Sequence, residues 1–236
     1  MHRLVEPEWL DELSPGDPRA QASRRDLRQL NAWMGNARTM ARALAAVLPQ
    51  PARRLVELGA GDGHFLCRVV RLLPSHWEGG SAVLLERLAV VSPQISRKFA
   101  AMGWQAETVT ADVFDWLNRQ RVQAGEALVA NLFLHHFPAA QLAELLGSAA
   151  RRAQAFVAVE PRRSTRAMTF SRLVGVIGCN SVTRHDAPIS VRAGFTGREL
   201  SQLWPANGEW TLEERPAGWF SHLFVARRIV PSPLVA

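Results

Sequence analysis

The chain has 236 residues, of which 47% are hydrophobic and 21% are charged. This balance supplies material for a sizeable core and excludes a chain that is disordered throughout. No apolar run reaches the roughly 18 residues that a membrane span requires, and the first residues lack the apolar stretch of a secretory signal. We therefore expect a soluble, cytoplasmic protein, folded as one large domain with a helical attachment.

The net charge of +7 raises the question of a nucleic-acid partner. The arginines occur as scattered pairs that never form a tract, and Lys98 is the only lysine, so no dedicated nucleic-acid surface is expected. The two cysteines, Cys67 and Cys179, form no close pair and belong to no Cys/His cluster. They predict two reduced thiols, with neither a disulfide nor a metal site.

The first part of the chain predicts an arm followed by helices. Residues 1–22 are rich in Pro, Asp and Glu and are expected to be extended. Residues 24–48 carry leucine and methionine at helical spacing with a break at Gly35, which predicts two helices joined by a bend. Pro49 is expected to end the second helix. We interpret residues 1–52 as an N-terminal arm and helical lid.

From residue 53 onward, short apolar strands alternate with helices. Strands that are apolar nearly throughout and are separated by helices indicate a parallel sheet covered on both faces. Two further strands near the C-terminus are joined by a short link, which predicts an antiparallel hairpin. The predicted fold is therefore an α/β, Rossmann-like, doubly wound sheet of seven strands. The expected strands are 54–58, 82–86, 108–111, 127–131 and 155–160, with the hairpin formed by 210–215 and 222–227.

One long connection interrupts this domain, which is expected to span residues 53–236. Residues 161–196 are expected to be partly helical and to cover the substrate pocket, because connections at the carboxyl ends of parallel strands form the site. Another helix is expected to begin at Thr196, with this residue as its cap.

The strongest motif is the run VELGAGDG at residues 56–63. Gly59 permits a tight turn off the first strand, Gly61 lets the backbone approach a ligand, and Gly63 lets the next helix pack closely. Glu57 ends the strand, where an acid repels a pyrophosphate and attracts a cationic or hydroxyl-rich ligand. The Gly-x-Gly-x-Gly spacing also differs from the Gly-x-Gly-x-x-Gly of dinucleotide-binding folds.

Two more acids stand at the ends of the next two strands. Glu86 ends the second strand, where a carboxylate accepts both hydroxyls of a ribose. Asp112 follows the third strand and is placed to accept a hydrogen bond from an adenine amino group, with Val113 packed on the ring. Three acids at the carboxyl ends of successive parallel strands indicate one shared ligand site.

On these residues the chain resembles the class I S-adenosylmethionine-dependent methyltransferases over about residues 53–228, especially the bacterial small-molecule type of specialised metabolism. The resemblance implies S-adenosylmethionine as cofactor, S-adenosylhomocysteine as product and no metal. It also implies that Asn131 lies beside the methionine moiety and that Arg38 of the lid pairs with its carboxylate. The expected cofactor-binding residues are Arg38, Glu57, Gly59, Ala60, Gly61, Gly63, Glu86, Arg87, Asp112, Val113 and Asn131.

The fourth strand carries the information about the acceptor. Residues 131–134 read Asn-Leu-Phe-Leu and lack the Asn/Asp-Pro-Pro-Tyr/Phe box of amino-methylating relatives. By resemblance to plant-type O-methyltransferases, His135 is the expected general base, a neutral imidazole with a pKa of about 6.5, although a role in helix entry is an alternative. His185, beside Asp186 in an expected loop, is a second candidate for the base or for acceptor binding. Glu160 is expected to orient the base or the acceptor.

The predicted function is methyl transfer to a small-molecule acceptor, at a hydroxyl of an aromatic or polyketide-derived metabolite. Three alternatives stay open: an RNA or protein methyltransferase, a non-catalytic partner subunit that keeps the fold, and a dinucleotide oxidoreductase. The expected partner is a small molecule, neither a membrane nor a nucleic acid is expected, and a homodimer is left open.

Overall fold

A seven-stranded mixed sheet lies at the centre of the computed structural model, which describes residues 1–48, 52, 54–119 and 126–229. Its strands are β1 (Arg54–Leu58), β2 (Ser81–Glu86), β3 (Gln105–Thr110), β4 (Glu126–Asn131), β5 (Ala155–Pro161), β6 (Trp210–Ala217) and β7 (Ser221–Arg228). They run in the order β3-β2-β1-β4-β5-β7-β6. Strands β1 to β5 are parallel, and β7 is antiparallel to both of its neighbours. This arrangement confirms the predicted doubly wound α/β sheet with a C-terminal hairpin.

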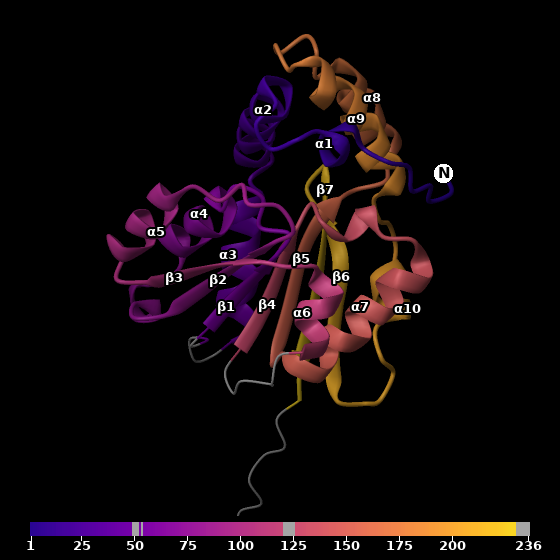
Figure 1. Cartoon of the computed structure of the whole chain (residues 1–236). Coiled ribbons are helices and arrows are strands. Elements are labelled where there is room, and N and C mark those ends of the chain that lie inside the picture. Colours follow the sequence, from indigo (N-terminus) through magenta and orange to yellow (C-terminus); the bar gives the residue numbers. More distant parts are fainter. Residues whose placement is uncertain (49–51, 53, 120–125, 230–236) are drawn as a thin grey trace, which may run out of the picture.

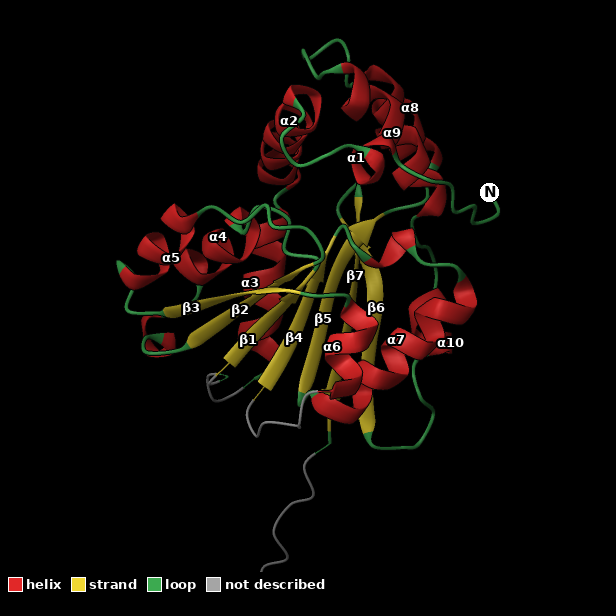
Figure 2. Cartoon of the chain, in the orientation of Figure 1, coloured by secondary structure: helices red, strands yellow, loops and turns green. Residues whose placement is uncertain are grey.

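Helices cover both faces of this sheet (Figure 1 and Figure 2). Successive residues of a strand point to opposite faces, so Leu55 and Val129 join one core while Val56 and Leu128 join the other. Helices α3 (Asn36–Val47), α4 (His64–Leu72) and α5 (Pro93–Ala100) cover the first face. Helices α6 (Val113–Arg119), α7 (Ala139–Arg152) and α10 (Glu199–Leu203) cover the second. Burial on both faces explains why the central strands are apolar throughout.

A separate group of helices stands above the carboxyl ends of the parallel strands (Figure 1). It consists of α1 (Trp9–Glu12), α2 (Pro18–Met34), α8 (Thr165–Leu173) and α9 (Ser181–Ala193), and we call it the lid. The hairpin of α8 and α9 packs against α1 and α2. Two segments far apart in the sequence therefore form one layer.

The N-terminal segment is more helical than predicted. Residues 1–22 were expected to be extended, but they contain α1 and the start of α2. The carboxylate of Asp17 accepts a hydrogen bond from the backbone N–H of Arg19 at 2.8 Å, and Pro18 occupies the first helical position. An aspartate cap followed by proline is a helix-start signal. Gly35, with φ 73°, forms the predicted bend between α2 and α3.

Three further expectations differ from the structure in detail. His185 was expected in a loop but lies within helix α9. Thr196 was expected to cap a helix, but α10 begins at Glu199 with Arg198 at the cap position. The link of the C-terminal hairpin comprises residues 218–220, because the two strands extend further than expected.

Two sequence expectations concern residues that the structure does not describe, namely the helix end at Pro49 and the domain boundary at residue 53. A short 3-10 turn, η1 (Ser75–Trp77), follows α4, and a second one, η2 (Leu134–His136), follows β4. None of the described helices combines the length and the apolar character needed to cross a bilayer.

Candidate functional site

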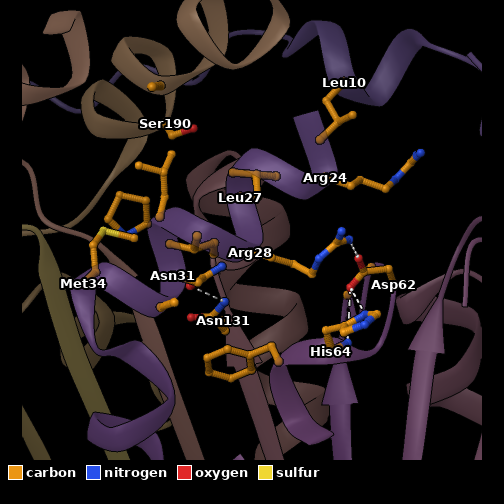
Figure 3. Close-up of a pocket in the computed structure, with 18 of the residues that line it drawn as sticks. Leu10, Arg24, Leu27, Arg28, Asn31, Met34, Asp62, His64, Asn131 and Ser190 are labelled. Atoms are coloured by element: carbon orange, nitrogen blue, oxygen red, sulfur yellow. Dashed lines mark hydrogen bonds and ion pairs between the residues drawn. The ribbon is translucent and has the colours of Figure 1, made fainter. Parts of the chain in front are cut away.

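A cavity of about 1220 Å³ lies between the carboxyl ends of the parallel strands and the lid. Figure 3 shows Leu27, Arg28 and Met34 of the lid facing this space from one side, with Asp62 and Asn131 on the other. The site therefore lies where open α/β sheets bind ligands, outside the carboxyl ends of the strands.

The structure brings only some of the predicted cofactor-binding residues to this cavity. Those that line it are Glu57, Gly59, Ala60, Gly61, Glu86 and Asn131. The others, Arg38, Gly63, Arg87, Asp112 and Val113, are not part of its wall.

The two glycines that line the cavity have different reasons to be glycine. Gly61 has φ 54°, and a Cβ built on it meets no described atom within 4 Å, so open space lies above its backbone. Gly59 has φ 68°, and a Cβ there would lie only 2.1 Å from Cδ2 of Phe133. Side chains rarely adopt such φ values, and both positions require glycine. Gly61 is the position at which a ligand can approach the main chain.

Glu57 is buried at the end of β1 and lines the cavity. Burial, opposed by a backbone hydrogen bond from Leu66, raises the pKa of Glu57 well above its ordinary value. Its Oε2 atom has no hydrogen-bond partner among the described residues. An unpartnered buried carboxyl oxygen beside a cavity is suited to a ligand that brings a hydrogen-bond donor or a positive charge.

Glu86 holds the glycine turn in place. Its Oε2 accepts the backbone N–H of Gly61 at 2.8 Å, and its Oε1 accepts the N–H groups of Arg87 and Leu88 at 2.9 and 3.3 Å. A carboxylate oxygen has more than one lone-pair site, so Glu86 can still accept hydroxyl groups of a ligand. Its carboxylate both shapes the turn and faces the cavity.

A cluster of three asparagine side chains lies under the lid. Nδ2 of Asn36 donates to Oδ1 of Asn31 at 2.9 Å and to Oδ1 of Asn131 at 3.1 Å, and Nδ2 of Asn131 donates to Asn31 Oδ1 at 3.1 Å. Ser221 of β7 donates to Asn36 at 2.6 Å. The cluster fixes the end of β4, including the predicted Asn131, against α2 and α3.

A chain of charged groups joins the lid to the glycine turn. Arg28 of α2 forms an ion pair with Asp62, whose other oxygen lies 3.2 Å from Nδ1 of His64 (Figure 3). Arg28 was not singled out by sequence analysis, which favoured Arg38. Arg38 is exposed on α3, outside the cavity wall.

Asp112 and Val113 stand at the start of α6. Oδ1 of Asp112 accepts the N–H groups of Phe114 and Asp115 at 2.8 and 3.4 Å and so caps this helix. Val113 is buried, whereas Asp112 is exposed. Their expected contact with an adenine ring remains a prediction.

His135 also lines the cavity and lies between two carboxylates. Its Nδ1 is 2.9 Å from Oε2 of Glu160, and its Nε2 is 3.4 Å from Oε1 of Glu8. Burial disfavours the charged ring, but the neighbouring carboxylates of Glu160 and Glu8 outweigh it and raise the pKa of His135 to about 9. This direction differs from the expected neutral imidazole with a pKa of about 6.5, and the role of His135 as a general base stays a prediction.

Glu160 contacts the His135 ring and the backbone of the turn that carries it. It is fully buried at the end of β5, and its Oε1 accepts the backbone N–H groups of Phe133 and Leu134 at 3.0 and 2.9 Å. The carboxylate thus shapes the η2 turn and holds the His135 ring. Its expected role of orienting the base or the acceptor stays a prediction. Glu160 does not itself line the cavity.

Leu132 adopts a strained conformation between β4 and this turn. Its φ of 51° makes it the one residue other than glycine with a positive φ in the described part of the chain. Strain of this kind persists where surrounding contacts hold it, and it is common at ligand sites. Leu132 lines the cavity between Asn131 and His135.

His185 is not part of this arrangement. Its ring stacks on Trp9 with centroids 3.7 Å apart, and its Nδ1 is 2.9 Å from Oδ1 of Asp186. It lines a separate small hollow on the lid, together with Trp9 and Arg172. The Asp186 carboxylate accepts the N–H groups of Trp9 and Leu10, so this pair anchors α1 to α9. The structure gives His185 no access to the main cavity.

Glu8 is the cavity residue that sequence analysis missed most completely. It is buried, although it precedes α1 in a segment expected to be an extended arm. It accepts a hydrogen bond from Ser190 of α9 at 2.5 Å in addition to its contact with His135. Burial opposes its ionisation, but these contacts lower the pKa of Glu8. No local sequence pattern marks an acid whose partners are more than a hundred residues away.

Comparison with known proteins gives a consistent picture of the fold. No family model matches the sequence, and no curated protein sequence matches it either. Among solved structures, the plantazolicin methyltransferase BpumL in complex with SAH is similar, with a TM-score of 0.64 and 10% identity over 91% of this chain and 92% of that one.

Two further similar structures are longer proteins. An O-methyltransferase family protein from Burkholderia thailandensis has a TM-score of 0.61 and 17% identity, and the mitomycin 7-O-methyltransferase MmcR has 0.58 and 15%. They match over 92% and 93% of this chain, which spans 62% and 60% of their own lengths. Together with the strand order and the C-terminal hairpin, these likenesses show that the chain has the fold of the class I S-adenosylmethionine-dependent methyltransferases.

Proposed function

We propose that this chain transfers a methyl group from S-adenosylmethionine to a hydroxyl of a small, largely apolar molecule. The observation that carries the proposal is a single lid-covered cavity that contains both the glycine turn with Glu57 and the region of His135. Methyl transfer needs the donor and the acceptor to be held together in one water-poor space.

The residues at the glycine turn fit this cofactor. The unpartnered carboxyl oxygen of Glu57 suits the amino group of its methionine part, and Glu86 suits the ribose hydroxyls. The open space above Gly61 admits a ligand close to the main chain. Asn131, fixed by the asparagine cluster, is positioned to donate to or accept from the methionine part. The cofactor supplies a methyl group that is already activated by its bond to a positively charged sulfur.

The lid supplies an apolar wall for the acceptor. Its inner surface carries Leu27, Leu30, Met34, Phe170, Val174 and, from the β6–β7 link, Phe220. Phe170 and Phe220 meet edge to face with ring centroids 4.9 Å apart. Aliphatic and aromatic walls of this kind favour a flat apolar ring over a charged acceptor. Aromatic or polyketide-derived acceptors are accordingly our proposal.

His135 has a different task from the general base of the sequence prediction. Both of its ring nitrogens already face carboxylates, so it cannot take the acceptor proton while these contacts hold. We propose instead that it is a positioning residue, which joins Glu8 of the N-terminal segment to Glu160 of β5 and so closes the acceptor end of the cavity.

Calorimetric titration tests the proposal directly. The full chain is titrated with S-adenosylmethionine, with S-adenosylhomocysteine and, as a control for the dinucleotide alternative, with NADH. We expect one S-adenosylmethionine bound per chain and no heat from NADH. Binding of NADH instead of S-adenosylmethionine would assign the fold to another reaction, and transfer of labelled methyl groups to RNA or protein would replace the small-molecule acceptor.

A further inference from the structure

Three side chains at the acceptor end of the cavity direct metal-binding atoms toward one another. The atoms that Glu8, His135 and His136 offer all lie within 4.8 Å of one another. Glu8 comes from the segment that precedes α1, and the two histidines come from η2. All three residues line the cavity, so their cluster is open to a molecule bound there.

The two histidine rings are oriented as metal-binding histidines commonly are. Nδ1 of His135 lies 2.9 Å from Oε2 of Glu160, and Nδ1 of His136 lies 3.1 Å from Oδ2 of Asp11. Histidines that bind metals usually hold their other ring nitrogen on a carboxylate or a carbonyl group. Nε2 is therefore the nitrogen that each ring has left to offer.

The spacing between the first two ligands agrees with a metal ion between them. Nε2 of His135 and Oε1 of Glu8 are 3.4 Å apart, which is long for a direct N–H···O hydrogen bond. Two ligands bound at about 2.1 Å to a tetrahedral ion are separated by about 3.4 Å. The structure thus holds these two atoms at the separation that a shared ion requires. The ligand atom of His136 lies within 4.8 Å of both.

We propose that Glu8, His135 and His136 bind one divalent transition-metal ion, with Zn²⁺ as the ion best suited to them. Two imidazoles and one carboxylate form a common Zn²⁺ ligand set, and three protein ligands leave a fourth position that faces the cavity. Binding replaces the proton on Nε2 of His135 with the metal.

The open position gives such an ion a role at the acceptor. A divalent ion would lower the pKa of a hydroxyl group bound to it, so an acceptor hydroxyl placed there would release its proton to water before the methyl group is transferred, without a histidine base. This role rests on the proposed function, whereas the metal site itself does not. The sequence predicts no metal, since Glu8 is far from the histidine pair and two adjacent histidines are not a ligand spacing.

Metal titration of the full chain tests the site. The protein is stripped with a chelator and titrated with Zn²⁺ against a chromophoric chelator, and Co²⁺ is used as a visible probe of ligand geometry. We expect one Zn²⁺ per chain and the absorption of tetrahedral Co²⁺. Asp11→Asn should weaken Zn²⁺ binding by about 10- to 100-fold, and Glu8→Gln and His136→Gln should weaken it further.

Matched variants separate loss of ligands from loss of charge or fold. Glu144→Gln and His76→Gln change exposed residues of the same types and should leave Zn²⁺ affinity unchanged. Glu8→Asp keeps the carboxylate and should retain part of the affinity, and circular dichroism checks that each variant is folded. The site would be overturned if the wild-type protein failed to bind one Zn²⁺ per chain. It would also be overturned if Glu8→Gln and His136→Gln bound Zn²⁺ with the affinity of the wild-type protein.

A parallel titration with S-adenosylmethionine keeps the two proposals apart. The metal-stripped protein should still bind S-adenosylmethionine, because Glu8, His135 and His136 are not among the residues that we assign to this cofactor. Zn²⁺ binding without S-adenosylmethionine binding would leave the metal site standing and remove the proposed function. The reverse result would remove only the metal site.

Discussion

The cavity has one part that we assign to the cofactor and another that we assign to the acceptor, here called the cofactor end and the acceptor end. The two are built in different ways. At the cofactor end, the glycine turn, Glu57 and Glu86 come from a single β-α-β unit, and rigid strand ends hold them. At the acceptor end, Glu8, His135 and Ser190 come from three distant segments that meet only in the folded chain. The first end is defined by local sequence, and the second is defined by long-range packing.

The ends also differ in how their acids are satisfied. Glu57 is buried with an unpartnered oxygen, so the cofactor end lacks a donor that a ligand can provide. At the acceptor end, Glu8 and Glu160 face His135, and Asp11 faces His136. The cofactor end thus has a buried acid without a partner, whereas each of these acids at the acceptor end faces a histidine ring.

The largest expected effect concerns the cofactor end. Gly61→Val places a branched side chain in the open space above the turn and forces valine into φ 54°. We expect S-adenosylmethionine binding to become undetectable by calorimetry, because the side chain occupies the ligand's space.

A second glycine variant controls for backbone strain. Gly103 has φ 72°, lies in an exposed turn and has equally open space around it, so Gly103→Val imposes similar strain away from the cavity. It should lower the melting temperature in the same manner and leave cofactor affinity unchanged. Normal affinity in Gly61→Val would show that the cofactor does not approach this turn.

The contrast explains how much the sequence could predict. The seven-stranded sheet, its C-terminal hairpin and the glycine turn follow from apolar strands and glycines at short spacing, and the predicted sheet and hairpin are confirmed. Gly59 illustrates the limit of such reasoning. Position 59 requires glycine partly because a Cβ there would clash with Phe133, which follows β4. A motif indicates where a turn lies, but the contacts around it depend on the whole sheet.

The acceptor end could not be predicted because its charges depend on tertiary contacts. His135 was correctly placed after β4, but its protonation depends on Glu8, which no pattern connects with it. His185 beside Asp186 has the sequence of a catalytic pair, yet the pair anchors α1 to α9. Adjacency in sequence does not show which way two side chains face.

Glu57→Gln should weaken S-adenosylmethionine binding by about 1.5–3 kcal/mol, the range for a hydrogen bond to a charged group. Burial raises the pKa of Glu57 well above 4.5, so the free protein keeps this proton to a higher pH than an exposed glutamate does. A bound amino cation favours the carboxylate, and binding should therefore release a proton. Calorimetry in two buffers with different heats of ionisation measures this release, which Glu57→Gln should abolish.

The raised pKa of Glu57 also predicts that the stability of the ligand-free protein depends on pH. As the pH rises above 4.5, the unfolded chain loses the Glu57 proton while the folded chain keeps it, so the free energy of unfolding falls. Urea melts of Glu57→Gln should lack this part of the fall, whereas Glu78→Gln, at an exposed position, should behave as wild type. Identical pH profiles for all three proteins would contradict the buried, protonated state of Glu57.

Asp112 is predicted to affect stability even without cofactor. Its Oδ1 caps α6, so Asp112→Ala should lower the free energy of unfolding by about 1 kcal/mol. Asp112→Asn retains a capping oxygen and should lose less. If the carboxylate also accepts from the adenine, Asp112→Ala weakens S-adenosylmethionine binding as well. Unchanged binding would limit Asp112 to its role as a cap.

The smallest expected effect concerns the ion pair that links the lid to the glycine turn. Arg28 of the lid pairs with Asp62 of the glycine turn, and its side chain is 38% exposed. Partly exposed pairs contribute about 0.2–1 kcal/mol and weaken with salt. Arg28→Ala should therefore lower cofactor affinity by no more than about fivefold at low salt, and less at high salt. Arg25→Ala, on the exposed side of α2, provides the control.

Hydrogen exchange shows whether this pair couples the lid to the cofactor. Bound S-adenosylmethionine should protect the amides of α2 in the wild-type protein, and Arg28→Ala should reduce that protection while leaving the strands unaffected. Protection confined to the sheet would mean that the lid does not respond to the cofactor. A loss of affinity well above tenfold would instead mean that Arg28 touches the cofactor directly. An ion pair of this exposure contributes too little binding free energy to explain such a loss.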